Sequence, residues 1–162
     1  MRVAALSICA MHDVHEAMDE IAATHLLSML DHGTRVETPD HLHPRHHLHM
    51  HFSDTDDRND PNAPTINDIR RIHSWADDVP EDGRIVIHCY MGISRSTSVA
   101  LGLMARHMRP TDAAEKLLKI RPQAAPNRLI VSHWDEILEL DGALNEAAEL
   151  LPLPFWASED WT

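Results

Sequence analysis

Cysteine, basic residues and long apolar runs are all scarce in this chain of 162 residues. Two cysteines, Cys9 and Cys89, are too few for the disulfide framework of a small secreted domain, so we expect a reducing, cytoplasmic compartment. Lys and Arg number 14 against 26 Asp and Glu, and the formal net charge of -12 disfavours nucleic acid or an anionic membrane as a partner. The chain reaches His12 and Asp13 before any long apolar segment develops, so neither a signal peptide nor a transmembrane helix is expected.

Strand-like and helix-like patterns alternate along the first part of the chain. Short apolar runs predict strands at 3–8, 24–30, 47–52 and 85–87, and helical spacing predicts helices at 12–22, 65–76, from 94 to 109, from 111 to 121 and from 127 onward. This order favours an α/β fold, a three-layer sandwich with a mainly parallel sheet of four to five strands flanked by helices. We assign one domain to residues 1–151 and an acidic, aromatic C-terminal tail to residues 152–162.

The predicted helices have recognisable ends and inward faces. Thr65 is placed to cap a helix, with Asp68 at the N3 position of a capping box. The last helix begins near Asn127 and could continue past Gly142 to Leu151. The expected buried residues are Val14, Met18, Ile21 and Ala22 in the first helix, Ile69, Ile72 and Ala76 in the second, and Ile130, Trp134, Ile137 and Leu138 in the last.

The stretch from residue 85 to 97, IVIHCYMGISRST, joins a buried strand, a loop and the start of a helix that Ser94, Ser96 and Thr97 can cap. Backbone N–H groups and the helix dipole converge on such a loop and favour an anion such as phosphate. The same donors stabilise a cysteine thiolate at the mouth of the loop, which makes Cys89 a candidate nucleophile. Arg95 supplies a planar fork for two phosphate oxygens, because guanidinium pairs with them bidentately.

Residues 88–96 resemble the signature loop of the cysteine-dependent protein tyrosine phosphatases, and residues 92–96 most resemble the dual-specificity branch, as in a compact, small bacterial-type member. Residues 52–55 lie where that branch has its general-acid loop, and residues 121–127 are similar to the segment after its signature helix. The resemblance implies a phosphotyrosine phosphatase-like catalytic domain over residues 1–151. It also implies hydrolysis of a phosphorylated protein or small phosphomonoester, with no metal or organic cofactor.

The resemblance also implies a role for each matching residue. Cys89 would form a phosphocysteine, Arg95 would hold the phosphate, and Asp54 would protonate the leaving group. Ser96 would assist departure of the sulfur, while His88 and Asn127 would support the loops. The phosphate-binding residues would be Tyr90, Met91, Gly92, Ile93, Ser94 and Arg95.

Alternatives stay open at the acid and for the activity as a whole. Asp56 or Asp57 could serve in place of Asp54, or these aspartates could form a solvated loop with Asp60. A rhodanese-like sulfurtransferase also uses a cysteine in an anion-binding loop but has no need of Asp54. A non-catalytic phosphoprotein-binding module would need neither Cys89 nor Arg95. The loop carries no lysine, which disfavours a polyphosphorylated inositol lipid.

The remaining chemistry-bearing residues favour structural interpretations. A half-buried strand over 47–52 would place three histidines on a polar face and its apolar residues inward, so no metal site is predicted. Cys9 is interpreted as a core residue in preference to a redox partner of Cys89. The tail aromatics are interpreted as packed, with self-association as the alternative. The histidines concerned are His41, His43, His46, His47, His49 and His51, the inward residues Leu48, Met50 and Phe52, and the tail aromatics Phe155, Trp156 and Trp161.

Overall fold

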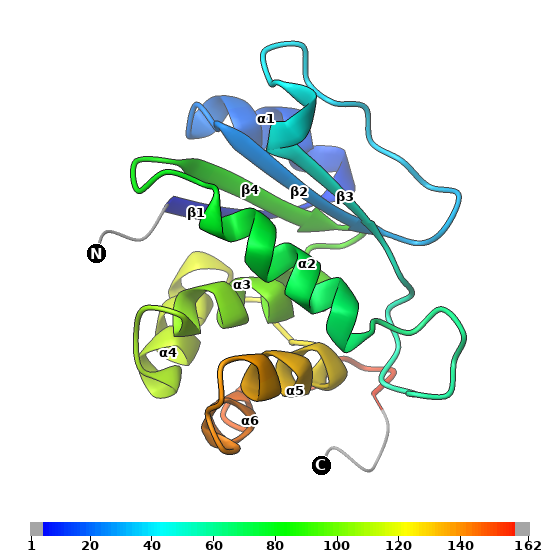
Figure 1. The fold of residues 1–162 in the computed structure, drawn as a ribbon, viewed down its shortest axis with the longest axis vertical. Coiled ribbons are helices and arrows are strands. Elements are labelled where there is room, and N and C mark those ends of the chain that lie inside the picture. The colour runs from blue at the N-terminus through cyan, green and yellow to red at the C-terminus, as the bar shows by residue number, and fades with distance from the viewer. Residues whose placement is uncertain (1–4, 158–162) are drawn as a thin grey trace.

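A computed structural model describes residues 5–157 and shows a sheet of four parallel strands within that range. The strands are β1 (Ala5–Ala10), β2 (His25–Leu30), β3 (His47–His51) and β4 (Arg84–Cys89), in the order β1-β4-β2-β3 (Figure 1). The predicted parallel sheet is therefore confirmed with four strands. Trp161 and the first two residues of the predicted 3–8 strand lie outside the described residues.

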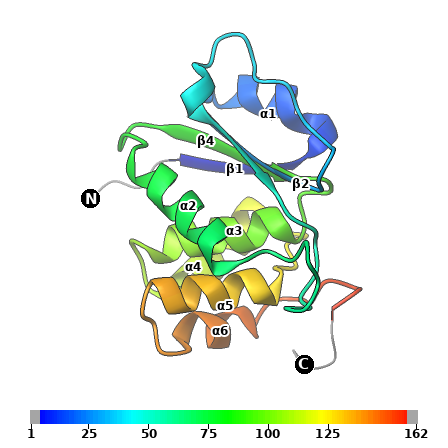
Figure 2. The same cartoon turned by 45° about the vertical axis from the view of Figure 1, so that its right-hand side comes forward.

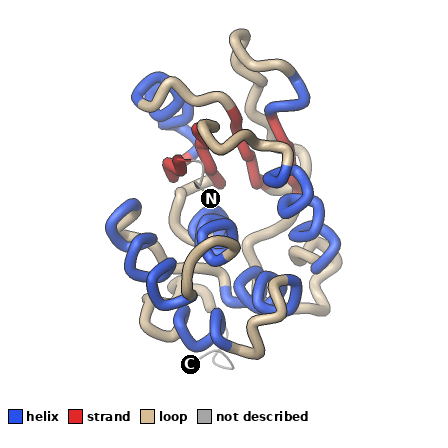
Figure 3. The backbone as a smooth tube through the Cα atoms, turned by 60° about the vertical axis from the view of Figure 1, so that its left-hand side comes forward, coloured by secondary structure: helices blue, strands red, loops and turns tan. Residues whose placement is uncertain are grey.

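Helices cover both faces of the sheet unequally, which confirms the three-layer sandwich. One helix, α1 (Val14–Glu20), packs on β1 and β4 from one side. The opposite face carries a larger layer, seen below the sheet in Figures 2 and 3. That layer consists of α2 (Ile66–Asp77), α3 (Arg95–Ala105), α4 (Pro110–Ile120), α5 (Arg128–Ile137) and α6 (Ala143–Ala148). No helix in residues 5–157 has the length and apolar character needed to cross a bilayer.

Strand β4 lies between β1 and β2 in the sheet and is buried on both faces, because α1 packs on one face and α3 on the other. Val86 contributes to the small core under α1, whereas Ile85 and Ile87 contribute to the large core on the other face. The carboxyl ends of parallel strands meet at one edge of a sheet. The residues that follow β2, β3 and β4 are consequently brought together there.

Helix α3 is buried along its whole length and sets the position of α5. A Cβ atom at Gly102 would lie 2.1 Å from the indole of Trp134, so only glycine lets the two helices approach this closely. The start of α5 is held by Asn127, which caps the helix by accepting a hydrogen bond from the Ile130 N–H at 3.1 Å and donates its own N–H to the Ser94 carbonyl at 3.3 Å. Asn127 is thereby held beside the loop that precedes α3.

The predicted helix ends are partly right. The capping box of Thr65 and Asp68 is present, with hydrogen bonds of 3.1 and 2.8 Å. Ala22 was expected to face inward but is exposed with φ of 47°, because α1 ends at Glu20 and the chain turns. The continuation of α5 to Leu151 is wrong, since the helix ends at Ile137 and left-handed residues at 139, 141 and 142 separate it from α6.

The expected hydroxyl caps at the start of α3 are absent. Ser94 occupies the N-cap position but its side chain makes no capping hydrogen bond there. The hydroxyl of Ser94 instead donates to Asp54 at 2.8 Å, and that of Ser96 lies 3.2 Å from the Cys89 sulfur. Thr97 donates back to the carbonyl of Ser94 at 3.1 Å. These hydroxyls serve the loop before the helix, which leaves the first N–H groups of α3 free of side-chain caps.

Candidate active site

In the loop from Tyr90 to Ser94, the carbonyl oxygens accept hydrogen bonds from groups outside the loop. Tyr90 O accepts from the N–H of Met11 at 3.0 Å, and Ile93 O accepts from that of Ala125 at 2.9 Å. The guanidinium of Arg121 donates to Gly92 O at 2.9 Å and to Met91 O at 3.3 Å, and Ser94 O accepts from Asn127 N at 3.3 Å. With every carbonyl engaged on the outside, the loop N–H groups are available on its inner side. This is the arrangement that an anion requires.

Gly92 is needed where this loop crosses the first strand. Its φ is 69°, and a Cβ atom there would lie 2.5 Å from the backbone carbon of Cys9. A side chain would therefore force the loop away from β1. The tight path depends on glycine both for its dihedral angle and for its closeness to another backbone.

Cys89 is the last residue of β4 and lies at the floor of the loop with only 2% of its surface exposed. Its sulfur is 3.2 Å from the hydroxyl oxygen of Ser96, the second residue of the following helix. When the sulfur is a thiolate it can only accept, so the Ser96 O–H donates to it. Strand and helix together hold the sulfur and its hydrogen-bond donor in fixed positions.

Arg95 is 95% buried and oriented by two acceptors on one of its nitrogens. Nη1 donates to a carboxylate oxygen of Asp31 at 2.8 Å and to the carbonyl of Phe52 at 2.9 Å. Within residues 5–157, the buried Nε of the same guanidinium has no hydrogen-bond partner. A buried, unpaired guanidinium N–H beside inward-facing amides is suited to an oxyanion.

His88 is fully buried and belongs to a chain of hydrogen bonds that crosses three strands. Its Nδ1 lies 3.0 Å from the Cys89 carbonyl, and its Nε2 lies 2.6 Å from the hydroxyl of Ser28 on β2. That hydroxyl is 2.8 Å from Nε2 of His47 on β3, whose Nδ1 is 2.7 Å from the hydroxyl of Thr38.

The direction of every bond in this chain follows from the charge state of its histidines. Burial lowers the pKa of His88 and lowers that of His47 to about 3, so both rings are neutral. A carbonyl can only accept, so His88 carries its proton on Nδ1 and Ser28 must donate to its Nε2. Ser28 therefore accepts from His47 Nε2–H, and Thr38 donates to His47 Nδ1. The chain fixes one tautomer of His88 and with it the carbonyl of Cys89.

Asp54 lies opposite the loop, in the segment after β3. Its Oδ1 accepts from Ser94 Oγ at 2.8 Å and from Asn127 Nδ2 at 3.0 Å. Burial raises the pKa of this carboxyl, and the hydrogen bonds from Asn127 and Ser94 and the charge of Arg95 offset the increase only in part. Because Oδ1 accepts two donors, the proton of the neutral acid belongs on Oδ2. A carboxylic acid that retains its proton to a higher pH than usual is suited to general-acid catalysis.

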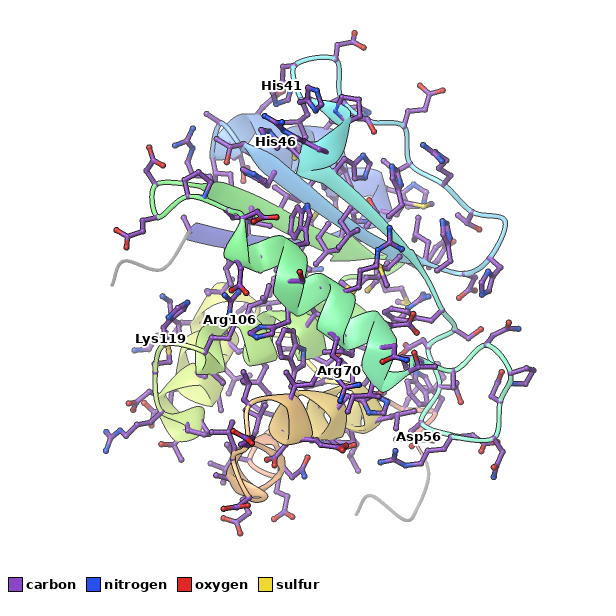
Figure 4. All side chains as sticks on the ribbon, in the orientation of Figure 1. His41, His46, Asp56, Arg70, Arg106 and Lys119 are labelled. Carbon is purple, nitrogen blue, oxygen red and sulfur yellow. The ribbon has the colours of Figure 1, made fainter. Side chains whose placement is uncertain are left out.

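The other aspartates of this segment are arranged differently. Asp57 and Asp60 accept hydrogen bonds from backbone N–H groups two residues further on, at 2.9 and 2.8 Å, and so shape the loop. Asp56, labelled in Figure 4, is not among the residues that line the cavity above Cys89. The geometry thus favours Asp54 over its neighbours as the acid.

A cavity of about 470 Å³ brings these groups together. The signature loop forms its floor, and Asp31, Asp54 and Arg95 provide its charged groups. Its remaining wall is the C-terminal segment, seen in red beside the loop after β3 in Figures 1 and 2. The lining residues are Asp31, Asp54, Cys89, Tyr90, Met91, Ile93, Ser94, Arg95, Ala125, Leu153, Pro154, Phe155 and Trp156.

The histidine-rich segment lies away from this cavity. Figure 4 places His41 and His46 at the opposite end of the molecule from Asp56. As predicted, Leu48 and Met50 of β3, and Phe52 directly after it, face the core. His47 is buried as well, because Ser28 and Thr38 satisfy its ring nitrogens. No group of three or more His, Cys, Asp or Glu side chains in residues 5–157 is arranged to hold a metal ion.

Five residues contribute to the site that the sequence patterns did not single out for it. Asp31 orients Arg95, Arg121 holds the loop, and Ser28 with His47 orients His88. Trp156 lines the cavity from the far end of the chain. Of these five, only Asp31 could have been proposed from the sequence, because it follows a buried parallel strand and so reaches the edge of the sheet where the signature loop lies.

Similarity to known proteins is found in structure only. No family model matches the chain, and no curated protein sequence matches it. The solved structure of DUSP15 aligns with a TM-score of 0.66 at 17% identity over 93% of this chain and 92% of that chain. The Yvh1 phosphatase domain from Chaetomium thermophilum gives 0.59 at 20% identity, over 86% and 93% of the two chains. The human tyrosine phosphatase-like serine/threonine/tyrosine-interacting protein gives 0.62 at 16%, over 82% and 87%.

These likenesses confirm the predicted fold. The chain has the α/β architecture of tyrosine and dual-specificity phosphatases along most of its length. One of the three is described as phosphatase-like and as an interacting protein, so the fold by itself does not decide between catalysis and binding. The choice between catalysis and binding therefore has to be argued from the side chains in the cavity.

Proposed function

We propose that the chain is a phosphomonoester hydrolase of the cysteine-dependent tyrosine and dual-specificity phosphatase type. The observation that carries the proposal is the convergence of Cys89, Arg95 and Asp54 on one cavity, with Asp54 held by a residue of the signature loop itself. A nucleophile, an oxyanion cradle and a proton donor are the three groups that a two-step displacement at phosphorus needs.

In the first step the Cys89 thiolate attacks phosphorus in line with the leaving group. The sulfur–phosphorus bond forms as the phosphorus–oxygen bond to the leaving group breaks, and Asp54 gives its Oδ2 proton to the departing oxygen. Arg95 and the loop N–H groups hold the equatorial oxygens. In the second step the Asp54 carboxylate takes a proton from water, which displaces the sulfur and releases phosphate. Ser96 stabilises the thiolate as it leaves, through the contact at 3.2 Å.

The Asp54 contacts also support this proposal over its rivals. A sulfurtransferase passes a persulfide through an anion-binding loop and has no use for a protonated carboxyl opposite it. A module that only binds phosphoproteins has no use for a buried thiol with a hydroxyl donor beside it. The chain retains both groups, and Asn127 and Ser94 are committed to holding the acid.

The substrates proposed are phosphorylated proteins or small phosphomonoesters. The net charge of -12 supports the further proposal that nucleic acids and anionic membranes are not partners. The low count of two cysteines supports the proposal that the protein works in the cytoplasm. Arg95 is the single cationic residue among those that line the cavity in the described part of the chain, which suits one phosphate group.

One assay tests the activity. Release of phenol from phenyl phosphate is measured for the wild type, for Cys89→Ser and for Asp54→Asn, with and without a chelator. We expect turnover by the wild type, loss of at least about 10⁴-fold in Cys89→Ser, and a loss of about 10²-fold in Asp54→Asn. An inert wild type, or an active Cys89→Ser, would overturn the proposal. Sensitivity of the rate to the chelator would contradict the metal-free steps above.

A further inference from the structure

The segment from Leu153 to Trp156 is held against the catalytic cavity by a buried arginine. Nη2 of Arg128, at the start of α5, donates to the carbonyl of Leu151 at 2.7 Å and to that of Pro152 at 3.3 Å. Arg128 is 94% buried, so it acts as a fixed anchor. The segment it positions then runs past the cavity and contributes four of the lining residues. This part of the chain belongs to the predicted C-terminal tail.

The segment adds apolar surface at the mouth of the cavity. Phe155 is 96% exposed, and Tyr90 and Met91, which also line the cavity, are each more than half exposed. In residues 5–157 the exposed large hydrophobic side chains are Tyr90, Met91, Leu118, Leu150 and Phe155. Three of these five line this one cavity, and a cluster of exposed apolar side chains around polar groups is typical of a binding site.

The segment also reaches the general acid. Trp156 lines the cavity together with Asp54, and its indole is near enough to that carboxyl to act on its pKa. This interaction lowers the pKa of Asp54 and is weaker than the contributions of Asn127 and Ser94. Asn127 and Ser94 both act on Oδ1 from the protein side. Trp156 belongs to the C-terminal segment, so Asp54 is also reached from that wall of the cavity.

We infer that residues 153–156 form a substrate-recognition wall, in which Phe155 binds the aromatic ring of an aryl phosphomonoester such as phosphotyrosine and Trp156 positions Asp54. The inference rests on the proposed phosphatase activity and names its substrate class. In this arrangement the phosphate lies in the loop above Cys89, and the ring it carries extends toward the exposed apolar side chains of Phe155, Tyr90 and Met91. An alkyl phosphate, such as phosphoserine, has no ring to fill this space.

Phe155→Ala tests the binding wall, with Leu150→Ala as a matched control because Leu150 is 71% exposed but does not line the cavity. For a phosphotyrosine peptide, we expect KM to rise about three- to tenfold in Phe155→Ala with kcat unchanged, since the lost contact is an aromatic one. KM for a phosphoserine peptide and inhibition by inorganic vanadate should stay at their wild-type values. The Leu150→Ala variant should match the wild type in all three.

The outcomes separate the two proposals. A wild type that hydrolyses no aryl phosphate overturns the proposed function itself. An active wild type together with an unchanged KM for the phosphotyrosine peptide in Phe155→Ala overturns the wall. An equal rise in KM for the phosphoserine peptide also overturns it, because the effect would then not depend on the ring.

Trp156→Phe tests the positioning of Asp54 through the leaving group. Phenol leaves slowly without a proton, whereas dinitrophenol leaves as its anion. We expect kcat for phenyl phosphate to fall about tenfold in Trp156→Phe while kcat for dinitrophenyl phosphate changes less than about twofold. Equal losses with the two substrates would mean that Trp156 supports the fold and not the acid. Unchanged rates with both would overturn its positioning role.

Discussion

The two halves of the catalytic cavity are held in place by different means. The nucleophile half is held through its backbone, because each carbonyl from Tyr90 to Ser94 accepts a hydrogen bond from outside the loop, either from a backbone N–H group or from the Arg121 guanidinium. The acid half is an irregular segment after β3, and Asp54 is held there by side chains from Ser94 and Asn127.

This difference has a consequence for how each half responds to change. A backbone cradle is built by one continuous strand, loop and helix, so a disturbance anywhere in it moves all of its donors together. A side-chain cage can lose one member and keep the others. We therefore expect substitutions near Cys89 to abolish activity. Substitutions around Asp54 should instead alter how the activity depends on pH and on how readily the leaving group departs without a proton.

Among substitutions outside the reacting side chains, the largest effect is expected for Gly92→Ala. The new Cβ atom would lie 2.5 Å from the backbone of Cys9, and alanine rarely adopts the φ of 69° found there. The loop must therefore move, and its N–H groups no longer point at one common position. We expect kcat/KM for phenyl phosphate to fall by about 10²- to 10³-fold. Gly33→Ala is the matched control, because Gly33 also has positive φ but nothing lies within 4 Å of a Cβ atom there. Near-normal activity in Gly92→Ala would contradict the rigid cradle.

Ser28→Ala should have the next largest effect. It removes the donor to His88 and the acceptor for His47, which leaves two buried ring nitrogens unpaired. We expect stability to fall by about 1–3 kcal/mol and kcat to fall about tenfold. Chemical denaturation and steady-state kinetics measure the two. Ser132→Ala, which removes a hydroxyl that bonds Leu129 on α5, serves as the control; if Ser28→Ala is as active as that control, the chain does not support the site.

Asn127→Ser should shift the pH profile with a smaller loss of rate. Serine can still cap α5, but it removes the Nδ2 donor that stabilises the Asp54 carboxylate. Loss of a donor to the charged form raises the pKa of Asp54, so the acid stays protonated to higher pH. The alkaline limb of kcat against pH should move upward. A downward shift would show that added water at Asp54 outweighs the lost hydrogen bond.

The smallest effect is one on stability, and it is expected from Asp54→Asn. Because the folded protein raises the pKa of Asp54, the charged carboxylate is disfavoured in the fold. Its cost is absent below the pKa of a free carboxyl and grows as pH rises toward the folded value. The variant should consequently be more stable than the wild type at neutral pH and equal to it in acid. Thermal unfolding at both pH values measures the difference, and a less stable variant at neutral pH would contradict it.

The order of elements and their inward faces were readable along the chain because they depend on local periodicity. Alternating strands and helices predicted the parallel sheet, and the capping box at Thr65 predicted where α2 begins. The end of α5 was mispredicted because apolar residues continue past Ile137, while the turn is made by left-handed residues such as Glu139 that carry no obvious sign. The hydroxyls before α3 were mispredicted because tertiary partners outcompeted the helix end for them.

What the sequence determined by itself is the nucleophile half of the site. Cys89, the loop and Arg95 occupy seven consecutive positions, so local chain geometry is enough to place them around one anion. The acid half was visible only as a choice among neighbouring aspartates. Tertiary structure decided it, by bringing Asn127 and Trp156 to Asp54. Tertiary structure also selected Ser28 as a support, because its role depends on which strands are neighbours in the sheet, and sequence spacing does not encode that.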